Sequence, residues 1–442
     1  MRIFRKELSD RQAISIQAVI FIALLIFASM ILEGCTDSCE VENRYVYFEP
    51  VYTSVEEIRG AVAMTSEQEM NNPGKIYFKD GFVFINERGE GIHIINNTDP
   101  QSPQNVGFIN IPGNFDLAAK GDFLYVDSYI DLVILNIADV NNITEVNRIE
   151  NIFEGYNSYG FHMDSQLGVV TDWVEAEQLQ ITESECDQRA GFFDFVRLNN
   201  GVAFAEDAGL APTVAPGANP GVGGSMARFT ISGDHLYTVD ESSLQSINIS
   251  NLQSPLVGEK LVIGWGIETI FPYTDKLFIG AQNGMHIVDN SNPDSPSLLS
   301  TYSHVQSCDP VVVDGSYAYV TLRSGTECQG FTNQLDVVDI SNPELPFLHK
   351  TYAMDNPHGL GVDGDALFIC DGESGLKVYD KADVNTIDSN QLAHYEDIHA
   401  FDVIPLNNVL MLIGEDGLYQ YDYSNLDKIR FLSKIDIQAN DN

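Results

Sequence analysis

The sequence predicts an all-β protein and, within that class, a seven-bladed β-propeller of four-stranded blades. Three observations support this. A five-residue phrase recurs seven times, mostly at intervals of about 40 residues, the length of one blade. Short runs rich in Val, Ile, Phe and Tyr precede each phrase, and a weaker run follows it. The phrases begin at Asn96, Asn136, Asn248, Asp289, Asp339, Asp380 and Asp422.

Each repeat reads as a β-hairpin, a turn and a closing strand. The hairpin turns carry Gly and Asp, as in Lys120-Gly121-Asp122, because these residues tolerate positive φ or bond to their own backbone. The phrase, typified by Asp289-Asn290-Ser291-Asn292-Pro293, then turns the chain, since Pro cannot donate to a ladder. Residues 297–302 exemplify the closing strand. One such sheet cannot bury both of its faces, so the repeats must stack on one another.

Two stretches carry a family resemblance. Residues 335–343 (LDVVDISNP) resemble the repeat of the LVIVD family of bacterial and archaeal envelope propellers, and residues 132–136 (LVILN) resemble its name-giving motif. The similarity runs from about residue 75 to the C-terminus. It implies a β-propeller in an extracytoplasmic setting and no established enzymatic activity. Val140, Leu252, Val384 and Leu426 stand where the phrase would have proline, which leaves the register of those turns open.

The interval between the second and third phrases is longer than the others. It fits one period plus an irregular insertion at about residues 152–227, or an eighth, degenerate blade as the alternative. We favour a strand extension of the second blade by residues 159–173. Residues 199–225, rich in Gly, Pro and Ala, are expected to form a flexible surface loop. We also expect the run 45–52 to close the propeller by pairing with a strand from the C-terminal end.

The N-terminus predicts export and a lipid anchor. Arg2, Arg5, Lys6 and Arg11 precede an apolar stretch, residues 13–32, as in a secretory signal. Leu32-Glu33-Gly34-Cys35 resembles a lipobox, with Cys35 as the lipidated residue. The predicted organisation is therefore a signal peptide at 1–34, a tether at 35–44 and a single propeller domain at 45–442. We expect the bacterial cell envelope, at the outer membrane; the alternative is an uncleaved single-pass anchor.

The cysteines agree with an oxidising compartment. Cys308 and Cys328 flank the first hairpin of one blade, so a hairpin could bring them within bonding reach. We predict a disulfide between them, in keeping with an extracytoplasmic protein. Cys370 lies in a predicted strand and reads as a small core residue. Cys39 and Cys186 have no evident partner.

The charge balance restricts the partners. The chain has 23 basic and 64 acidic residues, for a formal net charge of −41. Nucleic acid is disfavoured, because binding it requires a basic surface. An anionic lipid surface is disfavoured for the same reason. The acids are spread along the chain, which favours a role in solubility over a specific cation site.

Candidate ligand residues come from one position of the repeat. The first strand of each blade lines the centre of a propeller, and its beginning lies at one rim. Aligning the repeats on their hairpin turns returns polar residues at this position. Converging carboxylates and imidazoles could bind a polar ligand or a divalent cation, whereas the alternative is that they only satisfy strand ends. The candidates are Asp116, Arg228, Glu268, Asp309, His358, His399 and Asp402, with Lys75 at the matching position of the first repeat.

These observations favour a non-enzymatic, lipid-anchored envelope propeller. It would act as a monomeric scaffold that binds a protein, a glycan or another envelope component, without a required cofactor. No local motif for catalysis, metal binding or phosphate binding appears in the sequence. Propeller enzymes assemble their sites from several blades, so the alternative is a metal-assisted hydrolase, lyase or oxidase with its site at the axial rim.

Overall fold

The structure is a computed structural model that describes residues 40–45, 48–153, 163–164, 166–175, 180–185, 221–307, 310–325 and 331–437. The chain divides into two compact units: Met1–Glu49 with Trp173–Val202, and Pro50–Asp172 with Ala203–Asn442. In the smaller unit, strand β1 (Glu40–Tyr45) pairs antiparallel with β14 (Gln180–Glu185). The repeats lie in the larger unit.

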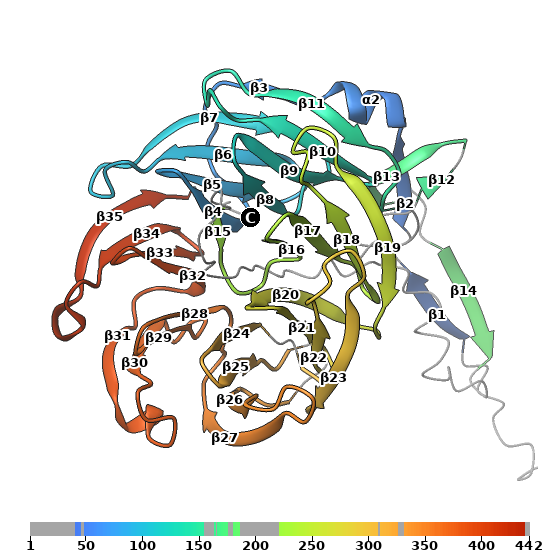
Figure 1. The fold of residues 1–442 in the computed structure, drawn as a ribbon. Coiled ribbons are helices and arrows are strands. Elements are labelled where there is room, and N and C mark those ends of the chain that lie inside the picture. Colours follow the sequence, from blue (N-terminus) through green and yellow to red (C-terminus); the bar gives the residue numbers. More distant parts are fainter. Residues whose placement is uncertain are drawn as a thin grey trace, which may run out of the picture. The chain divides into compact units, whose positions relative to one another are not determined.

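Four-stranded antiparallel sheets make up most of the larger unit, and in each of them the strands follow one another in chain order (Figure 1). This confirms the all-β prediction and the hairpin–turn–strand reading of the repeat. The sheets are β8 (Leu117–Lys120), β9 (Phe123–Ser128), β10 (Asp131–Asn136) and β11 (Thr144–Ile149); β16 (Phe229–Ser232), β17 (His235–Val239), β18 (Ser243–Asn248) and β19 (Leu256–Val262); β20 (Ile267–Tyr273), β21 (Lys276–Ala281), β22 (Gly284–Asp289) and β23 (Ser297–Ser303); β24 (Val311–Asp314), β25 (Tyr317–Leu322), β26 (Gln334–Asp339) and β27 (Phe347–Ala353); β28 (Leu360–Asp363), β29 (Ala366–Cys370), β30 (Leu376–Asp380) and β31 (Gln391–Tyr395); and β32 (Ala400–Leu406), β33 (Val409–Gly414), β34 (Gly417–Asp422) and β35 (Arg430–Asp436). Short 3-10 turns, η1 (Ile387–Ser389) and η2 (Leu426–Lys428), precede the last strand of the final two sheets.

The first repeat forms a sheet with an extra strand on each edge. Its own strands are β4 (Pro73–Lys79), β5 (Phe82–Glu87), β6 (Gly91–Asn96) and β7 (Gln104–Asn110). Strand β15 (Val222–Gly223) pairs with β4, and β3 (Ala63–Thr65) pairs with β7. Both exposed edges of this sheet are therefore covered by other segments of the chain.

The repeated phrase has one local structure in all seven copies. The side-chain oxygen of its first residue accepts a hydrogen bond from the backbone amide of its third residue, at 2.8 to 3.1 Å. Such turns need an Asp or Asn at the first position and place no demand on the fifth. The four copies that lack proline consequently turn in the same way, which resolves their register.

In five of its seven copies, the same phrase also contacts the preceding sheet. The carbonyl of its fifth residue accepts a hydrogen bond from a hydroxyl of that sheet, whether that residue is proline or not. These bonds run from Tyr125 to Leu252, Ser246 to Pro293, Ser300 to Pro343, Tyr352 to Val384 and Ser433 to Pro100. The side chain of the second residue also faces the preceding sheet; Asn97, for example, exchanges two hydrogen bonds with Gln420, at 2.7 and 2.9 Å.

The last sheet packs directly on the first. Ile76, Ile85 and Ile95 share one buried cluster with Met411 and Ile413. The bond from Ser433 to Pro100 lies at the same boundary. No strand is exchanged here: β35 pairs with β34, and residues 400–436 supply the whole sheet. The prediction that residues 45–52 pair with a C-terminal strand is wrong, because both terminal repeats already supply four strands.

The early run instead belongs to a separate small sheet. Strand β2 (Phe48–Thr53) lies beside β13 (Gly168–Glu175), which pairs with β12 (Met163–Asp164). Strands β12 and β13 thus form a hairpin, as their sequence suggested, but they do not extend the β8–β11 sheet. This corrects the favoured prediction for that stretch.

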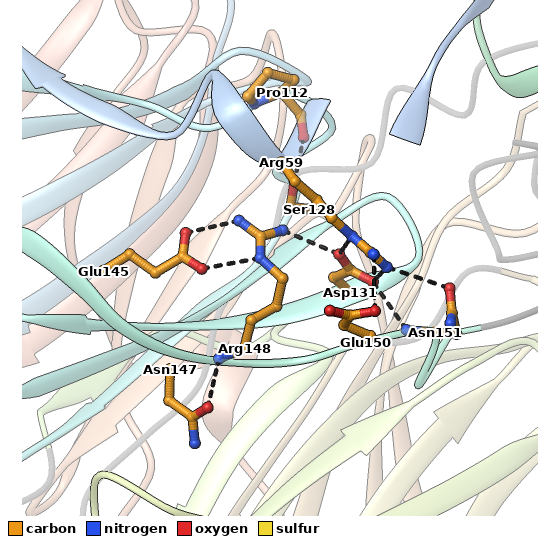
Figure 2. Close-up of polar contacts among 9 residues, drawn as sticks. All are labelled: Arg59, Pro112, Ser128, Asp131, Glu145, Asn147, Arg148, Glu150 and Asn151. Carbon is orange, nitrogen blue, oxygen red and sulfur yellow. Dashed lines mark hydrogen bonds and ion pairs between the residues drawn. The ribbon is translucent and has the colours of Figure 1, made fainter. Parts of the chain in front are cut away.

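Helix α2 (Val55–Gly60) is braced against the second repeat by a buried carboxylate (Figure 2). Asp131, 1% exposed, accepts from Arg59 Nε at 2.7 Å and from Arg148 Nη1 at 3.0 Å. The amide of Asn151 donates to it as well, at 2.8 Å. Burial opposes ionisation of Asp131, but the guanidiniums and the amide outweigh it and lower its pKa.

Candidate functional site

Residues 221–228 form what we call the central segment, because they lie among the first strands of several sheets. Strand β15 of this segment lies beside β4 (Figure 1). The amide of Gly221 donates to Ala119 in β8 at 3.0 Å, and the carbonyl of Ala227 accepts from Ile270 in β20 at 2.8 Å. Ser225 Oγ accepts from the amide of Leu360 in β28 at 2.9 Å. This stretch of the chain thus binds to first strands from separate repeats.

Small residues are required where the segment packs. A Cβ on Gly221 would lie 2.2 Å from the Tyr77 ring and 2.5 Å from the carbonyl oxygen of Phe78. All residues from 221 to 227 except Val222 are buried. The prediction of a flexible surface loop is therefore wrong for residues 221–225, and residues 199–220 lie outside the described part. The sequence signal was present in Gly-Val-Gly-Gly-Ser, since small residues suit a narrow buried path as well as a loop.

Asp116 and Arg228 meet at one end of the central segment, together with Lys75. The carboxylate of Asp116 forms a buried ion pair with the Lys75 ammonium. It also accepts from the backbone amides of Arg228, at 2.6 Å, and Leu117, at 2.7 Å. Burial lowers the pKa of Lys75, and the carboxylate of Asp116 opposes that shift. Asp116 therefore fixes the point at which the central segment enters strand β16.

Asp127 supports this arrangement and was missed by the sequence analysis. Its Oδ1 accepts from the amides of Phe115 and Asp116, at 2.8 and 2.9 Å, and from Asn114 Nδ2 at 2.8 Å. Burial raises the pKa of Asp127 to about 7, although the two backbone amides favour its charged form. It lies in β9 rather than at the rim position of the repeat, so alignment of the first strands could not find it.

Asp402 contacts the middle of the central segment. Ser225 Oγ lies 3.5 Å from its Oδ1, and the side chain of Asp402 is fully buried. A Cβ on Gly359 would lie 2.0 Å from the same oxygen, so the chain immediately before β28 passes directly over the carboxylate. Ser225 therefore connects the first strands of the last two sheets through the central segment.

His358 and His399 lie close together, with Phe401 between them. The two imidazole centroids are 6.5 Å apart, and each lies within 5.6 Å of the Phe401 ring. Burial lowers the pKa of His358 to about 2, and Arg323 and His399 add to the shift, so its imidazole is neutral. His399 pairs through Nδ1 with Glu415 at 2.8 Å.

The remaining candidates are separate or undescribed. Glu268 accepts from Gln282 Nε2 at 3.0 Å within its own sheet. Asp309 lies outside the described residues, as do Cys35, Cys308 and Cys328. In the described part of the chain, no three His, Cys, Asp or Glu side chains are grouped so as to hold a metal ion. The candidate residues thus form two local groups, one around Asp116 and one around His358, with Asp402 and Ser225 as a third contact.

Two further sequence predictions concern single elements. Cys370 is a free thiol in β29 with no exposed surface, and burial raises its pKa, as expected for a core residue. Among the helices that the structure describes, none has the length and apolar character of a membrane span.

The repeated four-stranded sheets and the phrase-based contacts between them define a β-propeller repeat protein. Comparison with family models identifies the repeat: the LVIVD repeat matches residues 114–150, 223–260, 275–304 and 307–354. The chain thus carries LVIVD repeats, as the sequence resemblance suggested, and the matched stretches lie within the sheets β8–β11, β16–β19, β20–β23 and β24–β27 and the turns that border them. No curated protein matches the sequence.

Solved structures resemble the chain only distantly. Hsv2 from Kluyveromyces lactis is 8% identical, with a TM-score of 0.45 over 84% of this chain and 98% of that one. BamB from Moraxella catarrhalis is 7% identical, with a TM-score of 0.46 over 86% and 97%. Sqt1 from Saccharomyces cerevisiae is 9% identical, with a TM-score of 0.46 over 88% and 99%. Likenesses at this level say nothing about what this chain binds.

Proposed function

We propose that this protein is a non-enzymatic, lipid-anchored β-propeller of the cell envelope that binds a protein, a glycan or another envelope component. The proposal is based on the contacts that the polar side chains at the first strands make with the rest of the chain. Asp116 and Asp402, which a ligand at the rim would need, contact Arg228 and Ser225 of the chain itself. Because these groups contact the chain itself, we expect recognition to use other surfaces of the larger unit.

We also propose that the propeller has seven blades. Each of the seven phrases follows the third strand of its own four-stranded unit, and the turn bond is the same in every copy. The bond from Ser433 to Pro100 and the shared cluster of Ile76 with Met411 favour packing of the seventh unit on the first. A cysteine pair at Asn97 and Gln420 should therefore crosslink within one chain; failure to crosslink in folded protein would argue against this closure.

The anchor rests on the lipobox-like stretch before Cys35. Cys35→Ala, or inhibition of lipoprotein maturation, should leave an unprocessed precursor. Cys39→Ala is the matched control and should be processed normally. If Cys35→Ala leaves the mass and the membrane fractionation of the protein unchanged, the proposed lipid anchor is wrong. Labelling of free thiols in the non-reduced protein should miss Cys308 and Cys328 if they form the proposed disulfide.

The binding role is tested by crosslinking in intact cells followed by purification of the full-length protein. A reproducible envelope partner that also binds the purified propeller would support the scaffold. A bound metal in fixed stoichiometry, lost on replacing His358 and Asp309, would instead favour an enzyme. The proposal includes a monomer without nucleic-acid partners, as the net charge of −41 suggests.

A further inference from the structure

The outer edge of one sheet already shows how a strand can be added to this fold. Strand β3 pairs with the end of β7, with Ala63 opposite Asn110 and Thr65 opposite Phe108. Asn110 Nδ2 donates to the carbonyl of Ala61 at 2.7 Å and fixes the incoming chain. The outer strand bulges before this point, where its pairing with β6 shifts register between Ile94 and Ile95. The straight stretch after the bulge is thus able to accept another strand.

Strand β19 presents the same edge on another repeat. Asn110 lies opposite Gly91, the first residue of β6, and Val262 lies opposite Ser243, the first residue of β18. The stretch of β19 that corresponds to 108–110 is therefore Lys260-Leu261-Val262. A bulge precedes it as well, where pairing with β18 shifts between Gln245 and Ile247. Among the strands that the structure describes, none pairs with this edge.

The edge of β19 also exposes large apolar side chains. Leu256 is 69% exposed and Val262 is 73% exposed. Trp265, in the link that follows, is 52% exposed. At the position of Val262, the neighbouring outer strands β23 and β27 carry Ser303 and Ala353. Exposed apolar side chains beside an exposed Trp mark a surface that protein partners recognise.

Charge around this edge selects the kind of partner. A Lys side chain on an edge strand opposes pairing with another chain. Lys260 lies on this edge, but it forms an ion pair with Asp240, with its Nζ 2.9 Å from Oδ2. Glu241 and Glu259 are exposed nearby. The whole protein also carries a net charge of −41. An approaching segment with basic side chains would therefore be attracted, and an acidic one repelled.

We propose that the edge of β19 binds an extended, basic segment of a partner protein, which adds as a strand to the β16–β19 sheet. This inference rests on the proposed scaffold function and names the surface and the partner chemistry. Backbone pairing supplies the docking, as β3 does on β7. Val262 and Trp265 contact the apolar residues of the segment, and Glu259 contacts its basic ones.

The test uses fluorescently labelled seven-residue peptides and the full-length protein, followed by fluorescence anisotropy. A peptide of alternating Lys and Val should bind, whereas a peptide of alternating Glu and Val should not. Val262→Lys should weaken binding of the Lys/Val peptide by about tenfold or more, because it removes apolar contact and adds a like charge. Ala353→Lys makes the same change of charge at the matching position of β27 and should leave binding within about twofold of the unmodified protein.

Absence of binding by the Lys/Val peptide would overturn the proposal, and so would equal losses in Val262→Lys and Ala353→Lys. Both substituted residues are exposed, and circular dichroism verifies that each variant is folded. Failure here is distinguishable from failure of the scaffold function. Crosslinking in cells would then still recover a partner, but its crosslinks would map away from residues 256–265.

Discussion

Asp116→Asn is the most informative single substitution in the polar group that holds the central segment. The side chains of Asp116 and Lys75 are 2% and 5% exposed, so their ion pair is almost fully removed from water. Asn retains one acceptor, but its NH2 group must face either the amide of Leu117, which donates to Oδ1, or both the Lys75 ammonium and the amide of Arg228, which donate to Oδ2. Removing one partner of a buried pair costs about 3–5 kcal/mol, because the other charge stays buried without compensation. We expect a loss of this size in the free energy of unfolding.

Equilibrium unfolding in urea at constant pH measures this loss as a shift in midpoint. Lys75→Met is the matched partner variant, since it removes the cation and leaves Asp116 with two backbone amides. The double variant should be more stable than Asp116→Asn alone, because no unpaired ammonium remains. If Asp116→Asn unfolds within about 1 kcal/mol of the unmodified protein, the carboxylate is not a structural anchor and the reasoning fails.

Three further predictions concern neighbouring features. Burial raises the pKa of Asp127 from 3.8 to about 7. Between about pH 4 and 7 the folded state therefore holds a proton that the unfolded state releases, so the free energy of unfolding should fall as pH rises through this range. Asp127→Asn should remove this dependence in urea titrations. Gly221→Ala should destabilise the protein by about 1–3 kcal/mol through overlap with Tyr77, whereas Gly60→Ala, which meets open space, should not. Ser433→Ala should cost about 1 kcal/mol by removing the bond between the last sheet and the first.

Each of these predictions has a contrary result. An unchanged pH profile in Asp127→Asn would mean that another group carries the dependence. Equal stability of Gly221→Ala and Gly60→Ala would contradict the close packing of the central segment. A neutral Ser433→Ala would show that the apolar cluster alone joins the two terminal sheets.

The strands could be predicted because the residues that set their turns lie within each repeat. Gly and Asp set the hairpin turns, and an Asp or Asn at the first position of the phrase sets the next turn. Val140 and Leu252 replace proline without changing the turn, because the first residue of the phrase sets it. The carbonyl of Leu252 also accepts the bond from Tyr125, since every residue has a carbonyl. The sequence analysis gave weight to the proline, although the residue type at the fifth position of the phrase can vary.

Contacts between distant segments could not be predicted in this way. The rim alignment found Asp116 and Arg228, but it did not indicate that the backbone amide of Arg228 is the donor. The burial of residues 221–227 depends on space between first strands, which composition does not report. The pairing of residues 48–53 with β13 was missed because a short β run carries no information about its neighbour.

Hydrogen exchange of residues 221–228, followed by mass spectrometry, tests most directly whether the chain fills its own centre. The amides of Gly221 and Arg228 are hydrogen-bonded, and the segment is largely buried. We predict that peptides covering this segment exchange as slowly as those from β4, its pairing partner. Exchange as fast as that of an unprotected loop would contradict the account, and the polar groups around Asp116 would then be free for a ligand.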